Sequence, residues 1–167
     1  ARALVGLAPH LFPEVLEEAF DTACAIEDER SRTEVLATLA PRLPEKLLSA
    51  ALATTHAIAD EWSRAEVLAA LAPHLPEAER HAALNEALAA ARGIIDEQSR
   101  ARTLAALAPH LPEAERHAVL IEALAAARAI VDERYRIRTL AALMPHLPEA
   151  ERHAVLTETL RCHPRNQ

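Results

Sequence analysis

Aromatic residues are nearly absent from this chain, and glycine is as rare. Phe, Tyr and Trp make up 2% of the 167 residues, and Gly occurs only twice. A core without aromatic bulk is built from Leu and Ala, which are both good helix formers. Residues typical of strands are also scarce. We therefore expect an all-α fold whose helices approach one another closely.

Cysteine is equally scarce. Cys24 and Cys162 lie near opposite ends of the chain and form no disulfide framework, so a reduced, cytoplasmic setting is expected. Cys24 lies in an apolar stretch typical of a core, and Cys162 has only an adjacent His163, so neither is predicted to be a nucleophile. No run of 18 apolar residues is present, which predicts no membrane span. The first ten residues also lack the layout of a signal peptide.

The charge is negative overall and unevenly distributed. The net charge is −7, which argues against a general nucleic-acid or acidic-membrane binder. The first 60 residues hold ten acidic and five basic side chains, whereas residues 133–167 hold four and six. The chain is thus acidic at one end and mildly basic at the other.

An internal repeat is the most informative feature of the sequence. The string APHLPE or a close variant recurs five times, and its first prolines are spaced by 32, 32, 36 and 36 residues: Pro9, Pro41, Pro73, Pro109 and Pro145. A second string of the type AIxDExSR recurs four times in step with it, at residues 25–32, 57–64, 93–100 and 129–136.

Each repeat is predicted to contain two helices. The first, helix A, runs from the Asp of the DExxR motif to the first proline, as in residues 60–72, because Asp60 is a good N-cap and Pro73 disfavours helical geometry before it. The second, helix B, starts at the second proline, as at Pro76. Its apolar stripe is Leu84, Leu88, Ala91 and either Ile94 or Ile95. Leu75 occupies the cap position and is expected to be buried.

The predicted fold is a right-handed α-solenoid of about five antiparallel helix pairs, hence about ten helices, forming a single domain over residues 1–167. The units are approximately 1–27, 28–59, 60–95, 96–131 and 132–167. The four-residue increase in spacing is expected to add one turn to helix B. The first unit lacks the DExxR start, so the chain is expected to begin inside a repeat. The polar end TETLRCHPRNQ is expected to be a natural C-terminus.

Helix pairs of this length resemble tetratricopeptide and HEAT-like repeats. The DExSRAxxLAxLAPHLPE pattern resembles more closely the repeats in the C-terminal arms of large bacterial signalling proteins that carry a STAND or NACHT-type NTPase. That resemblance implies a sensor or scaffold arm. No GxxxxGK[ST] motif is present, so any NTPase activity would lie outside this chain.

The nine histidines are the first candidates for chemistry. They recur beside the first proline (His10, His74, His110 and His146) and in helix B (His81, His117 and His153). Equivalent side chains in neighbouring units are separated by helix layers of about 8–10 Å, whereas zinc–nitrogen bonds are about 2.0–2.1 Å long. We expect partly exposed side chains, with no metal site and no cofactor.

The DExxR motif is the second candidate. Its occurrence in four successive units argues against a catalytic centre, which is needed once. An N-cap together with an intrahelical ion pair would explain it, with Asp28, Asp60, Asp96 and Asp132 paired to Arg32, Arg64, Arg100 and Arg136. We therefore expect no enzyme and no catalytic residue.

Two positions of helix A vary between units while the framework positions of the repeat, such as the DExxR motif, are maintained. They lie two and six residues after the motif Asp, on one face of the helix. We call these side chains the helix A stripe: Arg30, Glu34, Trp62, Glu66, Gln98, Arg102, Arg134 and Arg138. An exposed Trp62 would be a natural anchor for a partner, although it could instead fill a gap between repeats.

The sequence thus predicts a protein-interaction module that binds a protein or peptide through the helix A stripe. It predicts binding to neither nucleic acid nor membrane. An architectural spacer or self-association element without its own ligand is the alternative. Separately, we expect concentration-dependent self-association through an exposed apolar face of the truncated N-terminal repeat. A histidine-dependent metal hydrolase is the least favoured hypothesis.

Overall fold

The computed structural model describes the backbone of residues 2–7, 12 and 15–162, and the side chains of residues 5–7, 12 and 15–159. Every regular element in that part of the chain is helical, and none is a strand. The all-α prediction is therefore confirmed. None of the described helices combines the length and the apolar content that a bilayer span requires.

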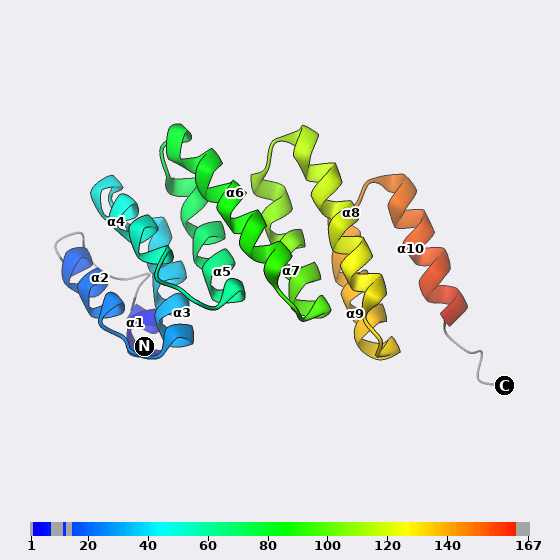
Figure 1. Cartoon of the computed structure of the whole chain (residues 1–167), viewed down its shortest axis with the longest axis horizontal. Coiled ribbons are helices and arrows are strands. Elements are labelled where there is room, and N and C mark those ends of the chain that lie inside the picture. The colour runs from blue at the N-terminus through cyan, green and yellow to red at the C-terminus, as the bar shows by residue number, and fades with distance from the viewer. Residues whose placement is uncertain (1, 8–11, 13–14, 163–167) are drawn as a thin grey trace. The chain divides into compact units, whose positions relative to one another are not determined.

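The helices alternate between the two predicted types along the chain (Figure 1). Those of type A are α1 (Arg2–Leu7), α3 (Glu29–Leu39), α5 (Glu61–Leu71), α7 (Glu97–Leu107) and α9 (Glu133–Leu143). Those of type B are α2 (Leu16–Cys24), α4 (Glu45–Thr55), α6 (Glu77–Gly93), α8 (Glu113–Ala129) and α10 (Glu149–Cys162). Helix B grows from 11 residues in α4 to 17 in α6 and α8, which confirms that it lengthens, by six residues where four were predicted.

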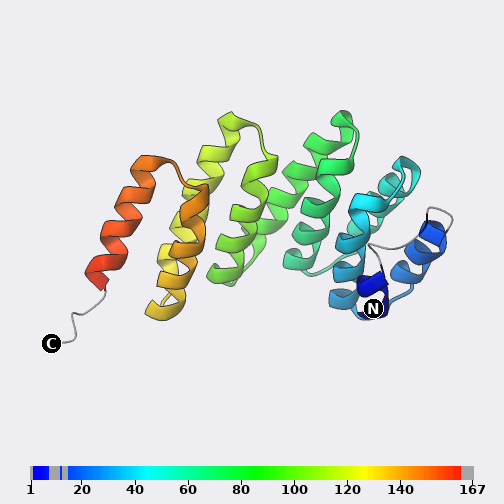
Figure 2. The same cartoon turned by 180° about the vertical axis from the view of Figure 1, so that it is seen from behind.

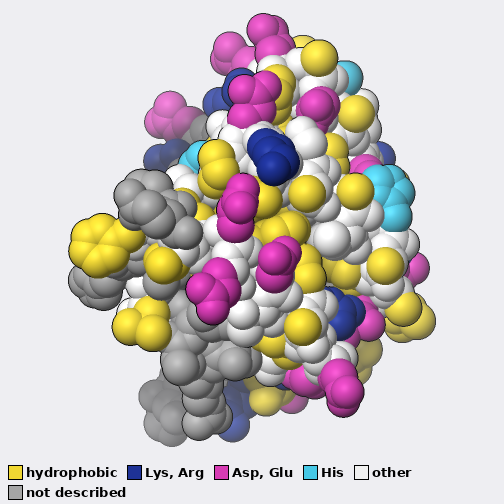
Figure 3. Space-filling model, turned by 90° about the vertical axis from the view of Figure 1, so that its left-hand side faces the viewer, with side chains coloured by type: hydrophobic (Ala, Val, Ile, Leu, Met, Phe, Trp, Pro, Cys, Tyr) yellow, Lys and Arg dark blue, Asp and Glu magenta, His cyan; other side chains and the backbone are white. Residues whose placement is uncertain are grey.

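The chain divides into two compact units, residues 1–91 and 92–167. In the first unit, α3 packs against both α2 and α5, and α4 packs against α5. Its large exposed apolar side chains include Leu7, Phe12 and Val15. One face of the molecule is shown in Figure 3, where acidic side chains lie among hydrophobic ones.

In the second unit, α8 packs against both α7 and α9, α7 packs against α9, and α10 packs against α9. The ribbon of α8 lies in front of α9 in Figure 1 and behind it in Figure 2, so the two helices form separate layers. In both units consecutive helices pack in pairs, which is the arrangement of a solenoid-like helical repeat.

The core consists of the aliphatic side chains that the repeat predicts. Leu68, Leu71, Leu104 and Leu107 of the helices A are at most 1% exposed. In helix B the buried isoleucine is Ile94, at 5%, whereas Ile95 is 89% exposed, which decides between the two predicted positions.

Both proline positions differ in detail from the prediction. Ala72 is helical, with φ −50° and ψ −44°, although it precedes Pro73. The helix tightens there into a 3₁₀ turn, Ala72–His74, in which Pro73 takes an early position that needs no N–H donor. The second proline is the N-cap of α4 and α8, Pro44 and Pro112, and these helices begin one residue later, whereas the N-cap of α2 is Val15.

Leu75 is buried, at 1% exposure, as expected. Its carbonyl oxygen accepts a hydrogen bond from the guanidinium of Arg80 at 3.0 Å. The same bond recurs in the second unit, where Arg116 and Arg152 donate to the carbonyls of Leu111 and Leu147. The arginine of helix B thereby satisfies a backbone acceptor in the preceding turn.

The prediction for the DExxR motif is correct for the aspartate and wrong for the arginine. Each aspartate is an N-cap: Asp28, Asp60 and Asp96 accept the backbone N–H of the serine three residues later, and Asp132 accepts those of Arg134 and Tyr135. No ion pair joins motif aspartate to motif arginine in the described part of the chain.

The motif arginines bond to backbone carbonyls instead. Arg64 Nη1 donates to the carbonyl of Ile58 at 3.0 Å, and Arg100 Nη1 donates to that of Ile94 at 2.8 Å. Arg32 and Arg136 make the same bond to Ile26 and Ile130. The arginine thus ties the start of helix A to the end of the preceding helix B, where carbonyl groups lack intrahelical partners.

Candidate functional site

In the first unit the helix A stripe lies on two neighbouring helices, α3 and α5. Arg30 of α3 lies over the ring of Trp62 of α5, with its guanidinium carbon 5.7 Å from the ring centroid. That separation is within the range of a cation–π interaction. Trp62 is half-buried. The tryptophan therefore packs against Arg30 of the preceding repeat and leaves part of its surface exposed to solvent.

The second row of the stripe in this unit consists of two carboxylates. Glu34 is exposed and Glu66 is half-buried. Burial raises the pKa of Glu66, the negative charge of Glu34 raises it further, and Arg30 partly opposes the shift. The two carboxylates are thus close enough to repel each other, and their positive neighbour Arg30 is engaged with Trp62.

In the second unit the stripe lies on α7 and α9 and is basic. Arg102, Arg134 and Arg138 are exposed, and Gln98 is half-buried. In the part of the chain that the structure describes, no carboxylate forms an ion pair with any of these three guanidinium groups. This contrasts with Arg100, two residues from Arg102, whose guanidinium is bonded to backbone carbonyls.

A surface hollow of about 450 Å³ lies beside the stripe at the start of α9. Its lining includes Asp132, Arg134, Tyr135 and Arg138. Tyr135 is 52% exposed and was not among the predicted site residues. The signal in the sequence was the replacement of the serine found at this position in the other units by tyrosine (Ser31, Ser63 and Ser99).

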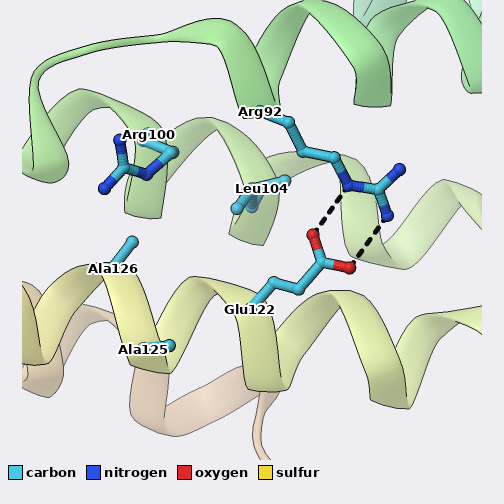
Figure 4. Close-up of a pocket in the computed structure, with 6 residues that line it drawn as sticks. All are labelled: Arg92, Arg100, Leu104, Glu122, Ala125 and Ala126. Carbon is cyan, nitrogen blue, oxygen red and sulfur yellow. Dashed lines mark hydrogen bonds and ion pairs between the residues drawn. The ribbon is translucent and has the colours of Figure 1, made fainter.

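A second feature that the sequence interpretation missed is a series of pairs between successive helices B. Arg92 donates two hydrogen bonds of 2.8 Å to the carboxylate of Glu122 (Figure 4). Arg128 and Glu158 form the equivalent pair at 3.0 Å, and His56 lies 3.8 Å from Glu86 in the first unit. All three pairs are 30 residues apart, a constant spacing that the repeat could have revealed.

These helix B pairs lie at the surface and contribute little to stability. The side chains of Arg92 and Glu122 are 52% and 40% exposed, a range in which an ion pair contributes about 0–1 kcal/mol. Arg92, Leu104 and Glu122 line a shallow hollow of about 370 Å³ together with Arg100, Ala125 and Ala126 (Figure 4). Its arginines are already bonded within the chain, so the hollow offers little to a charged ligand.

The histidines lie as expected for turn and helix-start residues. All of the described members of both series are exposed: His74, His110 and His146, and His81, His117 and His153. His10 lies outside the described residues. The described part of the chain contains no group of three His, Cys, Asp or Glu side chains close enough to hold a metal ion.

Cys24 is only partly buried, although a core position was expected. Desolvation raises the pKa of its thiol, and the nearby Asp21 raises it further. A thiol with a raised pKa is a weak nucleophile at neutral pH, because little thiolate is present. The side chain of Cys162 lies outside the described part of the chain.

Comparison with known proteins yields no relative: no protein-family profile, no curated protein and no solved structure matches this chain.

Proposed function

We propose that this chain is a protein-interaction module whose helix A stripe binds a protein or peptide partner. One observation carries the proposal: the maintained charged residues of helix A bond within the chain, while most stripe side chains do not. The motif aspartates cap helices and the motif arginines hold backbone carbonyls. In the described part of the chain, no hydrogen bond or ion pair engages the exposed guanidinium groups of Arg102, Arg134 and Arg138.

The composition of the stripe also suits an interaction surface. Trp and Arg are the residue types most enriched at the energetic centres of protein interfaces. The stripe contains Trp62 and four arginines, which alternate between units with Gln and Glu. A purely architectural repeat has no need for a change of charge and size at exposed positions while the capping Asp and the motif Arg are maintained.

The resemblance of the repeat pattern extends the proposal to the whole protein. The chain would be a scaffold or sensor arm, itself without catalytic activity, in a larger bacterial signalling protein of the STAND or NACHT type, with tetratricopeptide or HEAT-like construction. In such a protein the arm works in the cytoplasm and presents its stripe to a partner. This extension rests on the recurring DExSR and APHLPE strings alone.

The test is a comparative pull-down with the intact chain as bait and a lysate of its host. The stripe variant carries Trp62→Ala and Arg102→Glu. The matched control carries Ile121→Ala and Lys46→Glu, an apolar truncation and a charge reversal at exposed positions of α8 and α4. Circular dichroism verifies that both remain helical.

The proposal predicts a partner that the wild type and the control retain and the stripe variant loses. A partner that all three proteins recover equally would show that binding does not use the stripe. Recovery of no specific partner by the wild type would favour an architectural spacer.

A further inference from the structure

The position six residues after the motif aspartate changes sign between the two compact units. It is Glu34 and Glu66 in the first unit, and Arg102 and Arg138 in the second. In each unit the two side chains lie on neighbouring helices A, namely α3 and α5 or α7 and α9. One chain therefore carries a pair of carboxylates and a pair of guanidinium groups at the same register of the same repeat.

The two pairs have matching geometry because the same local structure positions them. Every helix A begins at an aspartate cap and is tied to the preceding helix B by the motif arginine. Neighbouring packed helices lie about 8–10 Å apart. Both pairs therefore occupy the same register on two helices A that pack against each other.

Both pairs lack a full complement of opposite charge. Glu34 and Glu66 lie within electrostatic range of each other, and Arg30, whose positive charge partly offsets this repulsion at Glu66, lies over the ring of Trp62. Arg102 and Arg138 are exposed and form no ion pair with a carboxylate in the described part of the chain, although Arg102 lies near enough to Asp96 to help lower its pKa. Bringing the two pairs together would relieve like-charge repulsion on both surfaces.

We propose that a second copy of this chain is a partner of the helix A stripe, with Glu34 and Glu66 of one copy facing Arg102 and Arg138 of the other. This inference rests on the proposed function and names one partner for the same face. Arg134, which borders the hollow at α9, adds a third positive charge beside Arg138. Because each copy carries both pairs, the contact is either reciprocal within a dimer or propagates from copy to copy.

The association is weak and strongly dependent on salt. Exposed ion pairs contribute about 0–1 kcal/mol each, so a few of them support only modest affinity. The Debye length falls from about 10 Å at 0.1 M to about 3 Å at 1 M ionic strength, which screens such contacts. Self-association is thus expected at low ionic strength and high protein concentration, and it disappears as salt is added.

A charge-swap experiment tests the proposal. The acidic-pair variant carries Glu34→Arg and Glu66→Arg, and the basic-pair variant carries Arg102→Glu and Arg138→Glu. The control carries Glu45→Arg and Glu77→Arg, the same change of charge at exposed first-turn positions of α4 and α6. Sedimentation velocity is measured on each protein, and on the mixture of the two pair variants, from about 1 μM to about 1 mM at low and high ionic strength.

The wild type and the control are expected to associate at low salt, and each pair variant alone is expected to associate about tenfold more weakly or not at all. Mixing the two pair variants should restore association, since Glu34 and Glu66 of the basic-pair variant then face Arg102 and Arg138 of the acidic-pair variant, as in the wild-type contact. It restores association only if the variant with four arginines binds the variant with four glutamates, which the proposal requires.

Three results would overturn the proposal. The first is a wild type that stays monomeric at every concentration at low salt, a result that leaves the pull-down test of the proposed function unaffected. The second is association that the pair variants retain, especially if Phe12→Ser abolishes it, because the contact would then use the exposed apolar side chains of the N-terminal repeat. The third is a mixture of the two pair variants that remains monomeric.

Discussion

Glu66 illustrates, at the scale of single residues, how the stripe differs from the rest of the repeat. The maintained positions place each charge beside a compensating group: hydrogen bonds from Ser31 and Ser99 lower the pKa of Asp28 and Asp96. Glu66 is instead half-buried beside another carboxylate, and its pKa is raised. The stripe therefore keeps a charge that costs the fold some stability.

Substitution of Glu66 by Gln should stabilise the chain at neutral pH. A carboxyl whose pKa is higher in the folded than in the unfolded protein favours folding when protonated, so its contribution is lost as pH rises through the folded pKa. We expect Glu66→Gln to gain about 0.5 kcal/mol at pH 7, since the group is half-exposed and screened. The gain should vanish below about pH 4, where the wild-type carboxyl is protonated in both states.

Urea unfolding of dilute protein at pH 7 and pH 3 measures this difference. Glu34→Gln is the matched control, because it removes the repelling charge but leaves Glu66 desolvated, and it should gain less. A Glu66→Gln variant that is less stable at pH 7 than the wild type would contradict the assignment of Glu66 as an uncompensated charge.

At the scale of the helix, the DExxR motif shows what could be predicted from sequence and what could not. The aspartate cap was predictable, because its acceptor bonds only N–H groups within the next three residues. The arginine was not, since Arg64 reaches a carbonyl six residues earlier, across the turn. The spacing of four residues suggested an intrahelical pair, but the unpaired carbonyl at the end of helix B competes for the same donor.

At the turns between helices, some features could be predicted from the sequence and others could not, for a similar reason. The burial of Leu75 was predictable from its place between two prolines. The helical geometry of Ala72 was not, because local preference before proline is weak compared with burial, and Ala72 is fully buried. Among the stripe residues, the sequence predicted their common face, whereas the packing of Arg30 on Trp62 depends on how α3 and α5 meet.

Arg100 and Arg102 provide a direct comparison of a framework and a stripe residue on one helix, α7. Arg100→Met should cost about 1–2 kcal/mol of unfolding free energy, because it leaves the carbonyl of Ile94 without its donor at 2.8 Å. Arg102→Met should change the unfolding free energy by less than about 0.5 kcal/mol, since its guanidinium is exposed and unpaired. Denaturant unfolding of both variants measures these two free energies. Equal losses of unfolding free energy would contradict the distinction between a framework arginine and a stripe arginine.

At the scale of the whole molecule, the chain is two compact units that share one framework and differ in the charge of their stripe. The first unit presents Trp62 with two carboxylates, and the second presents three unpaired arginines beside Tyr135. Because the framework is the same in both, this difference has no role in folding that the structure reveals. It is the property of the molecule most suited to selecting a partner.

Hydroxyl-radical footprinting of dilute chain, free and bound to a partner recovered in the pull-down, tests most directly whether that partner covers the helix A stripe. Trp62 and Tyr135 are both reactive aromatic side chains, and they report on the two units separately. The account predicts that binding reduces oxidation of Trp62, Tyr135 or both, and leaves the exposed helix B residues Ile121 and Leu156 unchanged. Protection of Ile121 and Leu156 with undiminished oxidation of both aromatic residues would contradict it.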